Sequence, residues 1–165
     1  MGGKSSKKEE PIINEEEALD SQFIKLKNSE ILPIIRCEYI NNDKKKWKIV
    51  FTGSQCSPYD DGYFILELLF LKGPFPKFGP EAKFITKMFH PNIDESSGHV
   101  CINILNNWDP KTTMEDVVLG ILEIMDNPVP DGGYSNEAKK LLETNVDEFY
   151  KRVEEYTAIY ANKGF

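Results

Sequence analysis

The sequence predicts an α+β fold in which one helix is followed by a four-stranded antiparallel sheet and then by three helices. Apolar residues recur at helical spacing over residues 14–27 and again from residue 113 onward. Between residues 34 and 86 they either alternate with polar residues or form a short apolar run bounded by glycine and proline, which is typical of strands. Consecutive strands followed by consecutive helices favour an antiparallel sheet with segregated helices.

The first helix is predicted over residues 14–27. Asn14 is its expected N-cap, with Glu17 in capping-box position, and residues 15–17 place three carboxylates at the positive end of the helix dipole. Its apolar face consists of Leu19, Phe23 and Leu26.

Strands are predicted over residues 34–40, 47–52, 63–70 and 83–86. Asn41-Asn42-Asp43 has the composition of a turn, and we expect Lys44 to Lys46 to form a solvated loop before the second strand. Residues 73–80 hold too many prolines and glycines for regular structure.

Three helices are predicted after a long irregular segment at residues 87–112. The first begins after Thr113, its N-cap, and should be the buried central helix. The other two are expected at about 135–143 and 147–161.

The size and charge of the chain limit the classes of function. A chain of 165 residues has room for one domain, and its net charge of −7 is concentrated in residues 113–162, which hold 11 acidic and 4 basic side chains. A negative surface without a basic stripe argues against nucleic acid as a partner. The three cysteines, Cys37, Cys56 and Cys101, are odd in number and widely spaced, which argues against disulfides and metal cages and favours a reducing compartment.

We expect residues 1–13 to be a flexible extension, residues 14–161 the folded domain and residues 162–165 a short tail. Gly2 followed by Ser6 fits an N-myristoylation pattern, and nearby lysines supply a second membrane signal. An ordinary disordered terminus or a remnant of cloning fits equally well. The expected location is the cytoplasm, with the nucleus as a second compartment, and a membrane surface if Gly2 is lipidated.

The residues with reactive side chains gather between positions 90 and 110. Cys101 could be a nucleophile that holds an acyl group as a thioester, with Asn92 donating a hydrogen bond to the oxyanion. It could instead form a hydrolytic dyad with a histidine, or be a buried structural thiol. A zinc site made from His90, His99 and Cys101 fits no usual ligand spacing, so no metal is expected.

The motifs His90-Pro91-Asn92, Cys101 and Trp108-Asp109-Pro110 resemble the active-site region of the ubiquitin-conjugating enzymes. The order of elements over residues 14–161 is also similar to that family, and Tyr59 to Phe64 resembles its strand entry, with Asp61 where glycine is usual. The resemblance implies a UBC-like fold. It also implies that Cys101 accepts ubiquitin or a related modifier from an activating enzyme and passes it to a substrate lysine, usually with a ligase. No cofactor is expected on the chain itself, because ATP is used by the activating enzyme.

The same resemblance implies roles for further residues. Asn92 would serve the oxyanion, while His90 would bond the backbone of its own loop. Asp131 would orient the incoming lysine, because Gly132 stands where the family often has Asp or Ser. The other residues implied are Pro91 in the active-site loop, Phe75, Pro76, Phe78, Trp108 and Pro110 facing a ligase, and Lys25 and Lys27 facing the activating enzyme.

Three departures from the family pattern keep alternatives open. Asn92 and Cys101 are nine positions apart, one more than usual, while Cys101 and Trp108 are one position closer than usual. Gly132 favours a second interpretation, a catalytically impaired fold that only binds ubiquitin. The run Cys101 to Leu105 resembles that of enzymes for the modifier Nedd8, and a SUMO-type modifier also stays open.

Overall fold

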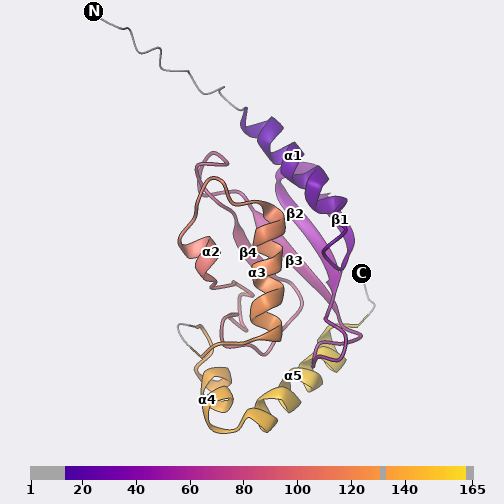
Figure 1. Ribbon diagram of the computed structural model, residues 1–165, viewed down its shortest axis with the longest axis vertical. Coiled ribbons are helices and arrows are strands. Elements are labelled where there is room, and N and C mark those ends of the chain that lie inside the picture. The colour runs from indigo at the N-terminus through magenta and orange to yellow at the C-terminus, as the bar shows by residue number, and fades with distance from the viewer. Residues whose placement is uncertain (1–13, 131–132, 163–165) are drawn as a thin grey trace, which may run out of the picture.

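The computed structural model describes residues 14–130 and 133–162 (Figure 1). Gly2, Asp131 and Gly132 therefore lie outside the described residues. The strands are β1 (Ile34–Ile40), β2 (Asp43–Thr52), β3 (Tyr63–Leu69) and β4 (Glu81–Phe84), and the helices are α1 (Glu15–Lys27), α2 (Asn103–Asn106), α3 (Met114–Asp126), α4 (Asn136–Thr144) and α5 (Val146–Tyr160). The sheet is antiparallel throughout, in the order β1-β2-β3-β4. The predicted α+β meander with an N-terminal helix and three C-terminal helices is confirmed; α2 is an addition.

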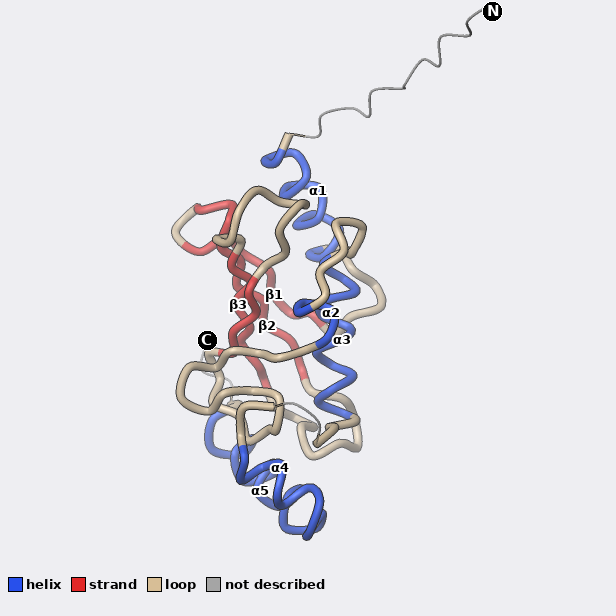
Figure 2. Tube along the Cα trace, turned by 90° about the vertical axis from the view of Figure 1, so that its left-hand side faces the viewer, coloured by secondary structure: helices blue, strands red, loops and turns tan. Residues whose placement is uncertain are grey.

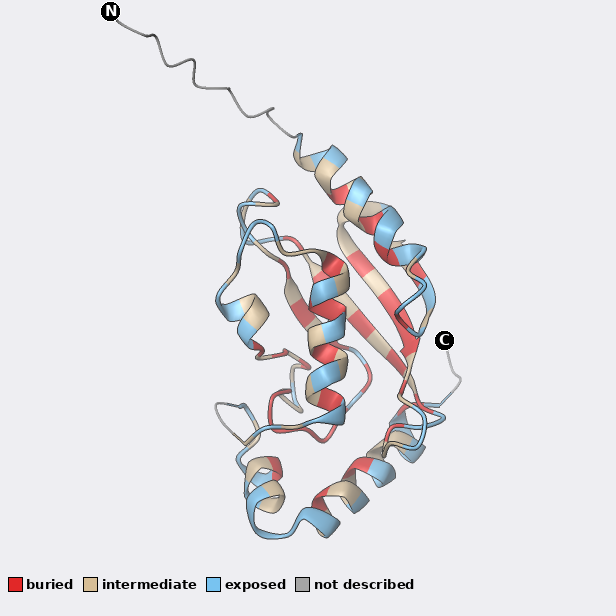
Figure 3. Cartoon of the chain, viewed as in Figure 1, coloured by how far each residue is buried: buried red, intermediate tan, exposed pale blue. Residues whose placement is uncertain are grey.

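The sheet and α3 form two layers, with α4 and α5 at one end of both (Figure 2). Buried residues alternate with less buried ones along α3 and the strands, as the red segments show (Figure 3), and they form one hydrophobic core. The central core of the sheet comprises Trp47, Ile49, Phe51, Phe64, Leu66 and Leu68. Met114, Val117, Val118, Ile121 and Met125 form the buried face of α3. The prediction that this helix is the buried central one is confirmed.

The helix caps explain where two of these helices begin. Thr113 and Asp116 form a reciprocal capping box at the start of α3, as the sequence predicts. Asn14 caps α1, but its side chain accepts a hydrogen bond from the amide of Glu16 at 3.1 Å and no capping box with Glu17 is formed. The dipole argument for the acidic first turn still holds.

The prediction that Lys44 to Lys46 form a loop is wrong. Asn41 and Asn42 adopt φ angles of 53° and 58°, so these two residues alone make the turn and β2 begins at Asp43. Backbone pairing places these lysines in the strand, and carboxylates of α1 face two of them, with Lys45 Nζ 2.9 Å from Glu15. Lys44 Nζ lies 2.6 Å from Glu16 and 2.7 Å from Asp20.

The edge strand β4 lies two residues earlier than predicted. It spans Glu81–Phe84 rather than 83–86 and pairs with β3 from Leu66 to Leu69. Thr86, beyond the strand, accepts a hydrogen bond from the amide of Ile65 through its hydroxyl, at 2.9 Å. In residues 85–113 the chain then forms only α2 and two isolated bridges, Lys83 with His99 and Ile93 with Val100. Within the two described stretches, no helix is long and apolar enough to span a bilayer.

Candidate active site

His90 links the active-site segment, residues 90–110, to the end of α3. Its Nε2 donates to the carbonyl of Ile124 at 2.7 Å, while its Nδ1 accepts from the amide of Asn92 at 3.0 Å. These two partners require the tautomer with the proton on Nε2. Burial lowers the pKa of His90 to about 4, so the ring is neutral at pH 7. The ring bonds the backbone of its own loop, as expected, and lacks a free nitrogen for catalysis.

Asn92 and Cys101 are neighbours across a tight backbone pairing. The amide of Cys101 donates to the carbonyl of Asn92 at 2.8 Å, and Ile93 and Val100 form the adjoining bridge. Asn92 is only 4% exposed, and its side-chain Oδ1 is buried without a hydrogen-bond partner among the described residues. Cys101, which this backbone bond pairs with Asn92, is half-buried.

The turn that separates Asn92 from Cys101 is held by a close backbone contact and by hydrogen bonds within the turn. Gly98 has a φ of 77°, and a methyl group on it would overlap the carbonyl oxygen of Phe84. The Asp94 carboxylate accepts hydrogen bonds from Ser96 and Ser97, which holds its pKa below the usual value. Residues 95–97 form a turn between Asn92 and Cys101.

Glu95 ties this turn to α5. Its carboxylate accepts a hydrogen bond from the hydroxyl of Tyr156 at 2.8 Å and lies 3.0 Å from Lys87 Nζ. The Lys87 ammonium also lies over the rings of Tyr156 and Tyr160, at 5.7 and 5.3 Å from their centroids.

The loop after α3 closes onto the active-site segment through Gly133. A methyl group on Gly133 would overlap the carbonyl oxygen of Pro91, and the amide of Ser135 donates to that oxygen at 3.3 Å. Sequence reasoning did not single out Gly133. The roles expected of Asp131 and Gly132 stay predictions, because both residues precede Gly133 in the part of the loop that is not described.

Asn106 is the second residue that sequence reasoning missed. Its side-chain Nδ2 donates to Cys101 Sγ at 3.3 Å from the last residue of α2. Neither histidine is placed for a dyad with Cys101, since His90 bonds only backbone and the ring of His99 pairs with Ser97 at 3.0 Å. The hydrolytic interpretation thus has no geometric support.

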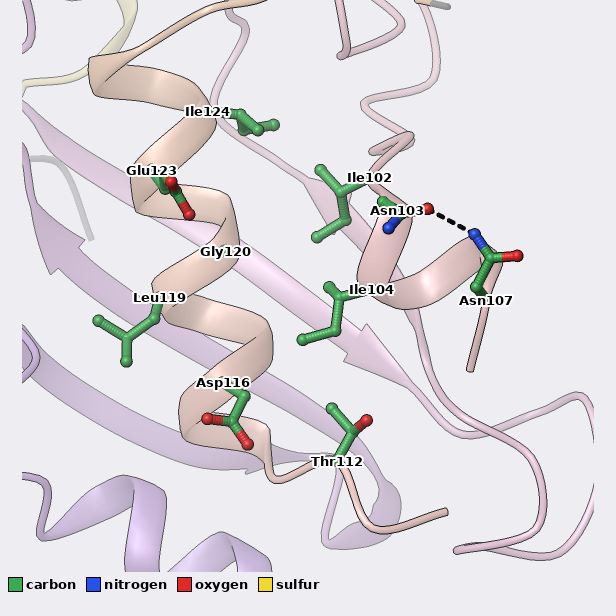
Figure 4. Close-up of a pocket in the computed structure, with 10 residues that line it drawn as sticks. All are labelled: Ile102, Asn103, Ile104, Asn107, Thr112, Asp116, Leu119, Gly120, Glu123 and Ile124. Atoms are coloured by element: carbon green, nitrogen blue, oxygen red, sulfur yellow. Dashed lines mark hydrogen bonds between the residues drawn. The ribbon is translucent and has the colours of Figure 1, made fainter. Parts of the chain in front are cut away.

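A groove of about 640 Å³ runs between α2 and α3, beginning at Ile102, the residue after the thiol (Figure 4). Ile102 and Ile104 point from the α2 segment toward α3, where Gly120 leaves space for them. Two carboxylates, Asp116 and Glu123, lie along the α3 side. The groove is therefore apolar at its centre and acidic along one wall.

Trp108, which follows α2, contacts the proline-rich loop formed by residues 73–80. Its indole N–H donates to the carbonyl of Pro76 at 2.8 Å, and its ring packs on Gly79 so closely that a methyl group there would overlap it. Phe78 is 40% exposed, and Pro110 is exposed. These residues can contribute to one continuous surface.

Phe75 does not belong to that surface. It is only 4% exposed and packs its ring against Phe70, with centroids 5.3 Å apart. The expectation that Phe75 contacts a ligase is therefore corrected, because its ring belongs to the core. Lys25 and Lys27, in contrast, are exposed near the end of α1.

The family model described as "Ubiquitin-conjugating enzyme" matches residues 18–157. The chain belongs to the ubiquitin-conjugating enzyme family. It is 33% identical over 134 residues to ubiquitin-conjugating enzyme E2 N of Macaca fascicularis, covering 81% of this chain and 87% of that one. It is also 31% identical over 122 residues to ubiquitin conjugating enzyme E2 B of Dictyostelium discoideum, covering 74% and 82% of the two chains.

A solved structure shows the same fold. A ubiquitin conjugating enzyme E2 domain of Toxoplasma gondii superposes with a TM-score of 0.78 at 25% identity, covering 88% of this conjugating enzyme and 98% of that domain. Membership of the family makes the chain a transferase with ubiquitin-conjugating activity. It also implies that the enzyme meets a modifier, an activating enzyme, ligases and substrates.

Proposed function

We propose that this conjugating enzyme carries ubiquitin as a thioester on Cys101 and transfers it to substrate lysines. The observation that supports this most directly is the pairing of the Cys101 amide with the Asn92 carbonyl, at 2.8 Å. This bond pairs the half-buried Cys101 with Asn92, whose side-chain Oδ1 is buried. The names of the relatives support ubiquitin as the modifier, although the run Cys101 to Leu105 keeps Nedd8 as the competing choice.

Loading is an exchange between two thioesters. The Cys101 thiolate attacks the carbonyl carbon of the modifier bound to the activating enzyme, a new C–S bond forms, and the donor sulfur leaves as a thiolate. Such an exchange is nearly balanced, so it needs no strong base beside Cys101. This agrees with a neutral, fully engaged His90.

Transfer to lysine needs an oxyanion donor. The lysine amine attacks the same carbonyl carbon, and negative charge develops on the carbonyl oxygen before Cys101 Sγ leaves. In the Asn92 carboxamide only Nδ2 can donate to that oxygen, because Oδ1 only accepts. Asp131 is proposed to receive the lysine, which must lose a proton to attack.

The groove beside Cys101 is proposed to receive the C-terminal tail of the modifier. The last residue of the modifier is bonded to Cys101, so the residues before it must cross the adjoining surface. The groove begins at Ile102 and offers apolar contacts at Ile104 and Leu119. Lys25 and Lys27 remain the proposed contacts for the activating enzyme, and Pro76, Phe78, Trp108 and Pro110 those for a ligase.

A charging assay tests the proposal. The enzyme is incubated with ATP and the activating enzyme for ubiquitin, and in parallel reactions with those for Nedd8 and a SUMO-type modifier. We expect a ubiquitin adduct that thiol reductant removes, that Cys101→Ala abolishes, and that Cys101→Ser converts into a reductant-resistant ester. Cys56→Ala, which removes another accessible thiol, is the matched control and should charge normally.

The other outcomes of this assay separate the alternatives. An adduct with Nedd8 alone would reassign the modifier while leaving Cys101 as the acceptor. If the enzyme bound ubiquitin but formed no covalent adduct with any of the three modifiers, it would be a catalytically impaired fold that only binds ubiquitin.

A further inference from the structure

We propose that Asn106 is a further catalytic residue, whose side-chain N–H stabilises negative charge on Cys101 Sγ. The proposal rests on Cys101 being the reacting thiol. Its direct evidence is the 3.3 Å contact from Asn106 Nδ2 to Sγ. Sulfur carries this charge twice in the proposed cycle, as the attacking thiolate during loading and as the leaving group during transfer.

The short helix α2 presents the donor. The amide of Asn106 bonds to the carbonyl of Ile102 at 3.1 Å, which folds the chain back so that the fifth residue after Cys101 reaches its sulfur. The side chains of Asn107 and Asn103 form a separate hydrogen bond along α2, in which Asn106 takes no part. Asn106 is thus positioned by backbone bonds and by α2, with its carboxamide directed at the thiol.

A neutral donor suits an exchange reaction. A nearby cation would bind the thiolate strongly and reduce its nucleophilicity, because nucleophilicity falls as a thiolate is stabilised. A single amide N–H stabilises the thiolate less than a cation would. Because a neutral thiol is a weak acceptor, this hydrogen bond strengthens mainly as the sulfur becomes charged. His90 and His99 both bond elsewhere, so neither ring supplies this charge.

The balance of each step is simple. In loading, Cys101 loses its proton to solvent, its sulfur forms the new C–S bond, and the donor sulfur leaves and takes up a proton. In transfer, the lysine nitrogen forms the C–N bond and loses a proton, while the C–S bond to Cys101 breaks and Sγ keeps the electron pair. Asn106 donates to Sγ at the start of the first step and at the end of the second.

Alkylation by iodoacetamide tests the contact without any partner protein. The reagent reacts with thiolates, and mass spectrometry of peptides follows each cysteine separately in the same molecule. Cys56 is exposed and serves as the internal reference, whereas burial raises the pKa of Cys37 to about 12 and keeps it unreactive. We expect Asn106→Ala to slow alkylation of Cys101 three- to tenfold at pH 7, and Asn106→Asp to slow it more, while Cys56 reacts unchanged.

Two further measurements separate charge stabilisation from a steric effect. The Cys101 rates of the wild type and Asn106→Ala should converge as the pH approaches 10, where thiols ionise without help. Asn107→Ala, which breaks the other side-chain bond of α2, should leave Cys101 alkylation within twofold of the wild type. Thermal unfolding of each variant shows that the fold is retained.

Either of two results overturns the proposal. One is a Cys101 rate in Asn106→Ala within twofold of the wild type at pH 7, and the other is an equal loss in Asn107→Ala. Because alkylation needs no activating enzyme or modifier, this result is independent of whether the charging assay succeeds.

Discussion

His90 is neutral because the fold needs both of its ring nitrogens for backbone partners. A protonated ring would have to donate from Nδ1 as well, where the amide of Asn92 already points its own hydrogen. Burial adds a desolvation cost to the charged form, which agrees with the lowered pKa of about 4. Protonation of Nδ1 should therefore break the hydrogen bond from the Asn92 amide, whereas the bond from Nε2 to Ile124 can persist.

This arrangement predicts a stability loss in mild acid. The ordinary pKa of 6.5 falls to about 4 on folding, so the unfolded chain binds the extra proton between these values and stability declines as pH falls through that window. We expect the free energy of unfolding to drop by about 2 kcal/mol between pH 7 and pH 5 because of His90. Urea unfolding at both pH values measures it.

His90→Gln provides the comparison, because a glutamine can donate and accept but does not titrate. The variant should be less stable than the wild type at pH 7 yet lose less stability on going to pH 5. An identical loss in both proteins would show that other groups cause the pH dependence.

The sequence was a good guide to residues whose neighbours are close in the chain. His90, Asn92 and Cys101 were named because their order is itself the signal, and the bond from His90 to Asn92 spans two positions. Asn106 and Gly133 were missed because their contacts depend on how α2 and the loop after α3 fold back. Phe75 was placed on the surface because the family resemblance assigned its whole loop to a ligase, and a resemblance between loops does not tell which side chains are buried.

At the level of elements, α3 shows how a glycine serves a groove. Gly120 interrupts a helix that would otherwise be better formed, since glycine is less favourable than alanine in a helix interior by about 0.5–1 kcal/mol. A methyl group there would lie 3.6 Å from Ile104 and 3.9 Å from Ile102, which are ordinary contacts. The fold therefore tolerates alanine at this position, but the added methyl group would fill part of the groove.

Gly120→Ala should separate stability from function. We expect it to unfold a few degrees higher than the wild type, with a gain of about 0.5–1 kcal/mol, and to discharge ubiquitin more slowly. Calorimetry and single-turnover discharge to free lysine measure the two effects. A stabilised variant with normal discharge would show that the modifier does not use this part of the groove.

For Gly133, in the loop after α3, we expect alanine to disturb the local structure rather than fit into it. Gly133→Ala places a methyl group on the carbonyl oxygen of Pro91, so the loop must move away from the active-site segment. We expect discharge to lysine to fall at least tenfold, since the loop carries Asp131, whereas loading of Cys101 should change less. Equal loading and discharge defects in Gly133→Ala would contradict this division.

At the level of the whole molecule, α1 is connected to the proline-rich loop. Glu15 Oε1 accepts from the amide of Phe75 at 3.1 Å and lies 2.9 Å from Lys45 Nζ, and these contacts hold the pKa of Glu15 below its usual value. The next residue of that loop, Pro76, accepts a hydrogen bond from Trp108 through its carbonyl. A surface proposed for the activating enzyme and one proposed for a ligase are thereby linked.

Removing the carboxylate should loosen that loop. In Glu15→Ala we expect the amide of Phe75 to exchange its hydrogen three- to tenfold faster than in the wild type, because its acceptor is lost, with a cost to global stability of no more than about 1 kcal/mol. Hydrogen exchange followed by NMR measures the single amide. Glu17→Ala alters an exposed residue in the same helical turn and should leave this rate unchanged; a similar rise there would assign the effect to α1 as a whole.

The order of helices and strands followed from local patterns, but links such as this one did not. Glu15 and Phe75 are 60 positions apart, and nothing in either segment indicates the other. Lys44 and Lys45 were misread for the same reason, since the carboxylates that face them in β2 come from α1. Periodicity reports which face of an element is apolar, whereas a charged residue reveals its partner only in three dimensions.

The position of Trp108, whose indole bonds to Pro76, also gives the enzyme a useful fluorescence signal. Trp47 and Trp108 are the two tryptophans of the chain, and Trp47, in β2, is fully buried, so docking partners cannot reach it. Changes in intrinsic fluorescence on adding a ligase domain would therefore come from the half-exposed indole that joins the two segments proposed to meet it. The encounter with a ligase can be followed in real time in the unlabelled protein.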